Sequence, residues 1–81
     1  MNREQLAQMF LDEWKKASPK VFRAQDPAFL KTEALALADR ALAEIKAVAW
    51  PGQQPEQVWS EVAGPFLATK CPQNQSVTQK A

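Results

Sequence analysis

Carboxylates and amines make up nearly all of the side chains in this sequence that could take part in catalysis. The chain has no histidine and no tyrosine, and Cys71 is its only cysteine. The usual combinations of nucleophile, general base and general acid depend on such residues and are therefore missing. A carboxylate pair is the remaining catalytic option, with candidates Asp12, Glu13, Glu33, Asp39, Glu44, Glu56 and Glu61. Their spacing is that of solvent-facing positions on amphipathic helices, so we expect a protein that is not an enzyme.

Metal and cofactor sites are equally short of suitable residues. A zinc site requires about four Cys, His or carboxylate ligands, usually with soft ones among them, and this chain offers one thiol. The only glycines, Gly52 and Gly64, each lie beside a proline, which excludes a glycine-rich phosphate loop. We expect no metal and no cofactor.

Length and charge narrow the remaining classes of protein. A chain of 81 residues predicts a single core, and a net charge of +1 provides no global attraction to nucleic acid or to an anionic membrane. One cysteine allows no internal disulfide, so we predict a cytoplasmic location, in a reducing environment. Charges interrupt residues 1–16, MNREQLAQMFLDEWKK, every few positions. This segment therefore predicts neither a signal peptide nor a membrane span.

A basic run between positions 15 and 31 is the strongest local charge signal. Basic side chains can neutralise phosphates and an aromatic ring can stack on a base, so this run could serve a nucleic-acid-binding accessory protein. Alternatively, the lysines complement a helix dipole while the aromatics face the core. We favour the second interpretation because nucleic-acid-binding domains are usually more basic. The basic residues are Lys15, Lys16, Lys20, Arg23 and Lys31, and the aromatic residues are Trp14, Phe22 and Phe29.

The helices that position these residues have clear start signals. Asn2 followed by Gln5 is the pattern of a capping box, and the first helix is expected to end at Ser18 and Pro19. Residues 19–26 are a connector that could contain one helical turn. A third helix is expected from Pro55, with a kink or a restart where Gly64 and Pro65 interrupt it. It is expected to bury Val58, Trp59 and Val62, although the first two are neighbours and one of them could be partly exposed.

A long central helix is predicted from Pro27, after the cap Asp26, to about Val48. Its apolar stripe is predicted from an alternating spacing of three and four residues. The stripe contains Leu35, Ala38, Leu42, Ile45 and Ala49, and is widened by Leu30, Ala34, Leu37, Ala41 and Val48.

A second strip of the long helix lies roughly opposite this stripe and contains Ala36, Ala43 and Ala47. Small side chains allow another helix to approach closely, which suits a partner helix or a twofold copy of the chain. Alanine is also the best helix former, so helix propensity explains the strip equally well. The bordering charges are Glu33 and Arg40 on one side and Asp39 and Lys46 on the other.

Together these features predict an all-α fold, a compact three-helix bundle over residues 1–71, with a short fourth helix after Pro65 as an alternative. Residues 72–81 are almost free of apolar side chains and are expected to form a flexible tail. By elimination, we predict a protein-binding module, a small adaptor or inhibitor that contacts a larger cytosolic protein, and its size favours a phage or plasmid source. The partner is another protein or a second copy of the chain; nucleic acid is the less favoured alternative, and no membrane contact is expected. The predicted partner-binding residues are Ala36, Arg40, Ala43 and Ala47 on the long helix and Lys15, Lys16, Lys20 and Arg23 in the basic run.

Overall fold

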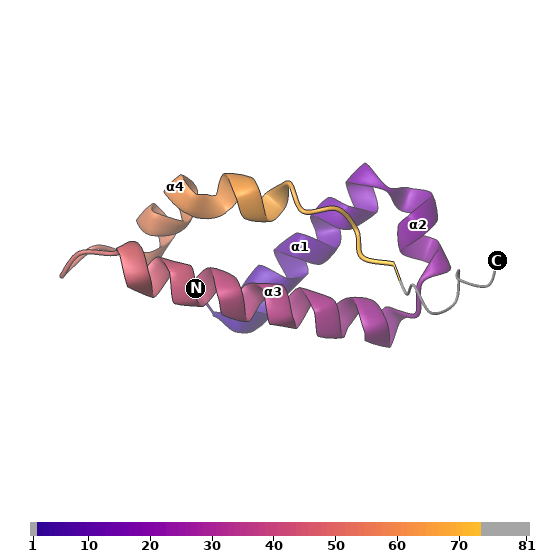
Figure 1. The fold of residues 1–81 in the computed structure, drawn as a ribbon, viewed down its shortest axis with the longest axis horizontal. Coiled ribbons are helices and arrows are strands. Elements are labelled where there is room, and N and C mark those ends of the chain that lie inside the picture. Colours follow the sequence, from indigo (N-terminus) through magenta and orange to yellow (C-terminus); the bar gives the residue numbers. More distant parts are fainter. Residues whose placement is uncertain (1, 74–81) are drawn as a thin grey trace.

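Four α-helices account for the fold in the computed structural model, which describes residues 2–73. They are α1 (Arg3–Ala17), α2 (Pro19–Ala24), α3 (Pro27–Val48) and α4 (Pro55–Leu67). In Figure 1, α3 runs the length of the bundle, α1 crosses it, α4 lies over its C-terminal half and α2 over its N-terminal end. No strand occurs in the described residues, so the all-α prediction is confirmed. Most of the predicted tail, residues 74–81, lies outside the described residues.

The start of each long helix follows from its local sequence. The Asn2 side chain accepts a hydrogen bond from the Gln5 backbone N–H, and the Gln5 side chain accepts one from the Asn2 N–H, both at 2.9 Å. Asp26 is the N-cap of α3, and its carboxylate accepts a hydrogen bond from the Ala28 N–H at 3.2 Å. Pro27, directly after Asp26, is the first residue of the helix. Side chains and prolines thus satisfy or remove the N–H groups that a helix start leaves without partners. These predicted boundaries are confirmed.

The fourth helix is not the one considered after Pro65. The extra element is α2, the helical turn expected in the connector, with Pro19 in its first position. Helix α4 instead continues through Pro65 to Leu67, so the predicted restart is wrong, and the alternative, a kink at Pro65, stays a prediction. Pro65 lies near the end of the helix and has no N–H to donate a hydrogen bond to the Glu61 carbonyl. Glu61 is exposed, so water can bond to that carbonyl instead. The following Phe66 packs against the core and keeps the last turn in place.

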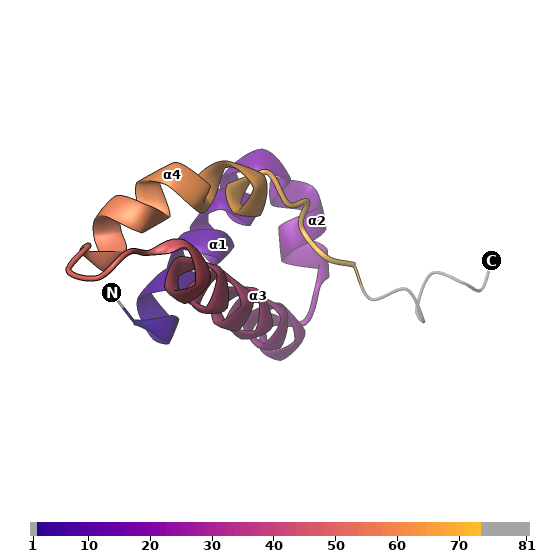
Figure 2. The ribbon, with the colours of Figure 1, turned by 60° about the vertical axis from the view of Figure 1, so that its left-hand side comes forward.

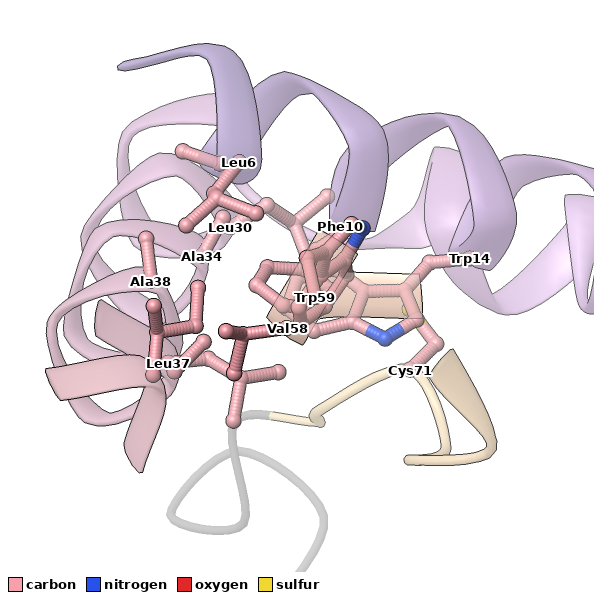
Figure 3. Close-up of a cluster of buried hydrophobic side chains, with 13 residues drawn as sticks. Leu6, Phe10, Trp14, Leu30, Ala34, Leu37, Ala38, Val58, Trp59 and Cys71 are labelled. Atoms are coloured by element: carbon pink, nitrogen blue, oxygen red, sulfur yellow. The ribbon is translucent and has the colours of Figure 1, made fainter. Parts of the chain in front are cut away.

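The core lies between α1, α3 and α4, and aromatic rings fill its centre. Figure 3 shows Phe10 and Trp14 of α1 beside Trp59 of α4, with Val58 and the small residues of α3 to one side. The Phe10 and Trp59 rings meet edge to face with centroids 5.9 Å apart, and Phe66 lies 6.0 Å from Trp59. Both Val58 and Trp59 are buried, so the core position favoured for Trp59 is confirmed, and neither residue is the partly exposed neighbour that the sequence left possible. Two neighbours on a helix can both be buried here because α4 packs against α3 and the Trp59 ring also meets Phe10 of α1.

Helix α3 is rotated relative to the stripe predicted for it. Leu35, Leu42 and Ala49 are only half-buried, and Val48 is 46% exposed. The ten predicted apolar positions span an arc of about 160° at about 100° per residue, and spacing alone does not determine which part of this arc is buried most deeply. The fully buried line is Leu30, Ala34, Leu37, Ala38, Ala41 and Ile45.

The chain after α4 returns along the bundle and closes its open side. The Trp14 indole Nε1–H donates a hydrogen bond to the Thr69 carbonyl at 3.1 Å. Two residues further on, Cys71 is buried in the same cluster. Pro72 is half-buried, so packed chain extends one residue beyond the predicted boundary of the helical region.

Candidate functional site

The outward face of α3 is the candidate site that the long helix presents. Ala36, Arg40, Ala43 and Ala47 are all exposed. At about 100° per residue they fall within one narrow arc, and the line from first to last spans about 16 Å of helix. We call these four residues the outward line. It lies roughly opposite the buried face of α3, as the sequence predicted.

The charges beside the outward line differ in whether the fold already uses them. Asp39 is engaged, because the Arg3 guanidinium donates to it from Nε at 2.7 Å and from Nη2 at 3.2 Å. Glu33, Arg40 and Lys46 have no hydrogen bond or ion pair within residues 2–73. Three charges of both signs therefore remain available to a partner, and Asp39 does not.

A small hollow adjoins the N-terminal part of the outward line. It measures about 140 Å³, and Ala36 and Arg40 line it together with Lys70 and Pro72 of the returning chain. Ala43 and Ala47 do not line it. The structure therefore places the first half of the outward line beside the C-terminal segment, across this hollow, while Ala43 and Ala47 lie on exposed helix surface.

The basic residues of the predicted patch line different hollows or none. Lys15 and Lys16 line a hollow beside α1, while Arg23 lines a different hollow between α2 and α3. Lys16 lies 3.9 Å from Glu13, which reduces the local positive charge. Lys20 is exposed on α2 and lines neither hollow.

The aromatic residues of the basic run face inward. Trp14 is buried and its indole N–H is already bonded to Thr69, so its ring has no free face for a base. Phe22 and Phe29 are half-buried and pack against the core. Base stacking, which carries much of the affinity for single-stranded nucleic acid, therefore finds no fully exposed ring among Trp14, Phe22 and Phe29.

Trp50 is a surface feature that sequence reasoning missed. Its side chain is 69% exposed, directly after α3, and Val48 nearby is also exposed. A turn holds it in place, because the Gln53 N–H donates to the Trp50 carbonyl at 3.0 Å and Gly52 has a positive φ of 86°. The Pro51–Gly52 pair is the sequence signal of such a turn and could have indicated that Trp50 projects from the bundle.

The groups that could take part in catalysis or bind a metal do not gather at one site: Glu56 lies on the surface, whereas the Cys71 thiol lies in the core. Within residues 2–73, no three His, Cys, Asp or Glu side chains come together as a metal site. A hydrogen bond from its own backbone N–H lowers the pKa of Glu56 at the start of α4, so this carboxyl is ionised at neutral pH and cannot serve as a general acid there. Burial raises the pKa of the Cys71 thiol, which makes it a weak nucleophile.

A search for membrane-spanning helices and a comparison with known proteins both gave negative results. Among the helices of the described residues, none combines the length and the apolar character that crossing a membrane requires. Comparison of the chain with protein-family models, with curated proteins and with solved structures gave no significant match.

Proposed function

We propose that this chain is a non-enzymatic protein-binding module, a small adaptor or inhibitor that contacts a larger cytosolic protein through the outward line of α3. One observation carries the proposal. The outward line repeats, on the exposed side of α3, the spacing of its buried side, and three of its four residues are alanines, as are three of Ala34, Ala38, Ala41 and Ile45, which accommodate the rest of the bundle.

The spacing supports contact with a helix. Both lines follow steps of four, three and four residues, the spacing that keeps one seam of a helix facing another. The three alanine side chains of the line let helix axes approach closely, and Arg40 within the line and Glu33 and Lys46 beside it provide charges for specificity. Trp50 is exposed on its turn beyond the end of α3, and tryptophan is one of the residue types enriched among those that carry most of the binding energy of protein interfaces.

The test compares three variants against the same partner captured by the wild-type protein. Ala43→Arg replaces a small side chain of the outward line, about one helical turn from Arg40, with a second long charged side chain and should abolish capture. Ala28→Arg is the matched control, because Ala28 is also exposed on α3 but lies outside the line. Circular dichroism should show that both variants are folded, since an exposed helix position tolerates arginine.

The third variant reverses the charge of Lys15, Lys16, Lys20 and Arg23 and tests the nucleic-acid alternative. On the present proposal it leaves capture unchanged. Loss of capture in this variant with retention in Ala43→Arg would reject the outward line as the contact surface. Sedimentation of the purified chain then distinguishes a second copy from a different protein, because Ala43→Arg would dissociate a homodimer built on this line.

A further inference from the structure

A hollow of about 350 Å³ opens where α1, α2 and the beginning of α3 meet. Its apolar wall comes from all three helices, and Leu30 in that wall belongs to the buried core. Arg23 and Gln25 supply the polar groups. The lining residues are Leu11, Phe22, Arg23, Gln25, Pro27 and Leu30.

The hollow exists because α2 cannot close onto α3. Helix α2 has six residues and buries none of them fully, and the linker that follows it is extended, with φ −92° and ψ 153° at Gln25. Proline begins both α2 and α3, which fixes the direction in which each helix starts. Figure 2 shows α2 held above the start of α3 by this linker. The extended linker and the two prolines therefore help to set how α2 stands relative to the start of α3, beside the hollow.

Arg23 gives this apolar hollow a preference for negatively charged ligands. The side chain is exposed, it has no hydrogen bond or ion pair within residues 2–73, and no carboxylate is among the lining residues. A guanidinium beside an apolar wall attracts anions more strongly than one surrounded by water. Its planar fork of N–H donors matches a carboxylate or a sulfonate.

We propose that the hollow is a binding site for a small amphipathic anion, with an apolar body of one ring system or a short alkyl chain and one carboxylate or sulfonate group. The apolar body would lie against Leu11, Phe22 and Leu30, and Arg23 would bind the anionic group. Ligand sites in proteins measure about 300 to 1,000 Å³ and combine an apolar lining with a few polar groups, so this hollow suits a compact ligand. The site is separate from the outward line of α3 and does not depend on the proposed protein contact.

A matched pair of fluorescent probes tests the proposal on the full chain. Anilinonaphthalene sulfonate carries the anionic group, and N-phenylnaphthylamine has the same aromatic body without it. We expect the sulfonate to bind at a single site and more tightly than the neutral probe. Arg23→Gln should weaken sulfonate binding by about 3- to 10-fold, the range for losing one exposed charge-assisted contact, and leave the neutral probe unchanged.

Two controls separate Arg23 from general attraction by positive charge. Lys20→Gln makes the same charge change on the same helix outside the hollow, and should alter neither probe's affinity. Arg23→Lys keeps the charge without the fork of donors and should give an intermediate loss of sulfonate binding. Near-ultraviolet circular dichroism confirms in each case that the tryptophans remain packed, since loosened cores also bind the sulfonate probe.

Amide chemical shifts locate the site, and octanoate, compared with octanol, tests the alkyl form of the ligand. We expect the largest shifts at Leu11, Phe22 and Leu30, and displacement of the sulfonate probe by octanoate more than by octanol. Equal affinity for the two probes, an effect of Lys20→Gln as large as that of Arg23→Gln, or shifts centred on another surface would each overturn the proposal.

Discussion

The two faces of α3 carry similar residues and have opposite environments. On the inward face Ala34, Ala38 and Ala41 are completely buried, whereas Ala36, Ala43 and Ala47 on the outward face are exposed. Helix propensity is the same for all of them, so propensity cannot distinguish a packing position from a solvent position. The distinction comes from the larger residues on either side. Leu37 and Ile45 flank the inward alanines and turn them toward the core, while charged residues flank the outward ones.

The same substitution on the two faces should give the largest difference. Ala38→Arg places a charge without a partner in the core, which should cost more than about 3 kcal/mol and so remove most or all of the stability of a small domain, which is about 3 to 5 kcal/mol. Ala43→Arg should change the free energy of unfolding by less than about 0.5 kcal/mol. Urea denaturation followed by tryptophan fluorescence measures both. An unfolded Ala43→Arg variant would mean that the outward line is an internal contact, and would remove the basis of the proposed function.

A second comparison tests the rotation of α3 with two leucines. Leu37→Ala leaves a cavity in the core and should lower the free energy of unfolding by about 2 to 4 kcal/mol. Leu42→Ala should lower it by about 1 kcal/mol, because Leu42 is half-buried and water already surrounds part of its side chain. The predicted apolar stripe would place Leu42 at its centre and reverse this order. Denaturation of the two variants under identical conditions therefore decides how the helix is turned, and a larger loss for Leu42→Ala would contradict the structure.

The success of the sequence predictions depends on how local their causes are. The caps at Asn2 and Asp26 and the proline at position 55 act on their own helix, and those boundaries were predictable. The continuation of α4 through Pro65 depends on Phe66 reaching the core, which is a tertiary contact and left no local signal.

The candidate site shows the same division. Ala36, Ala43 and Ala47 were placed on one exposed face from periodicity alone. The separation of Lys15 and Lys16 from Arg23 depends on the direction of α2, which spacing along the chain does not determine. The exposure of Trp50 likewise depends on where α4 turns back.

Residues 69–73, the segment that follows α4, lie beside one end of the outward face of α3. Truncation measures how much this segment contributes to the stability of the bundle. A chain ending at Ala68 loses the Thr69 carbonyl and leaves the buried Trp14 indole N–H without a partner, which should cost about 1 to 3 kcal/mol. A chain ending at Gln73 keeps these contacts and loses only NQSVTQKA, so its stability should stay within about 0.5 kcal/mol of the full chain. Thermal denaturation of both truncations is the measurement. Equal losses in the two would show that residues 69–73 do not stabilise the bundle.

The smallest expected effect concerns the ion pair between Arg3 of α1 and Asp39 of α3, which lies between the inward and outward faces of α3. Arg3 and Asp39 are each about half exposed, with side-chain exposures of 50% and 53%, so water screens their attraction. Two parallel hydrogen bonds give the pair good geometry, and we expect a coupling energy of about 0.5 to 1 kcal/mol. A double-mutant cycle with Arg3→Gln and Asp39→Asn measures it, and it should shrink in about 1 M salt, where the screening length is about 3 Å. A salt-independent coupling above about 2 kcal/mol would instead make this pair a principal link between α1 and α3. Asp39→Asn should also leave partner capture unchanged, because the fold already uses Asp39, whereas Arg40 in the outward line and Glu33 and Lys46 beside it remain available.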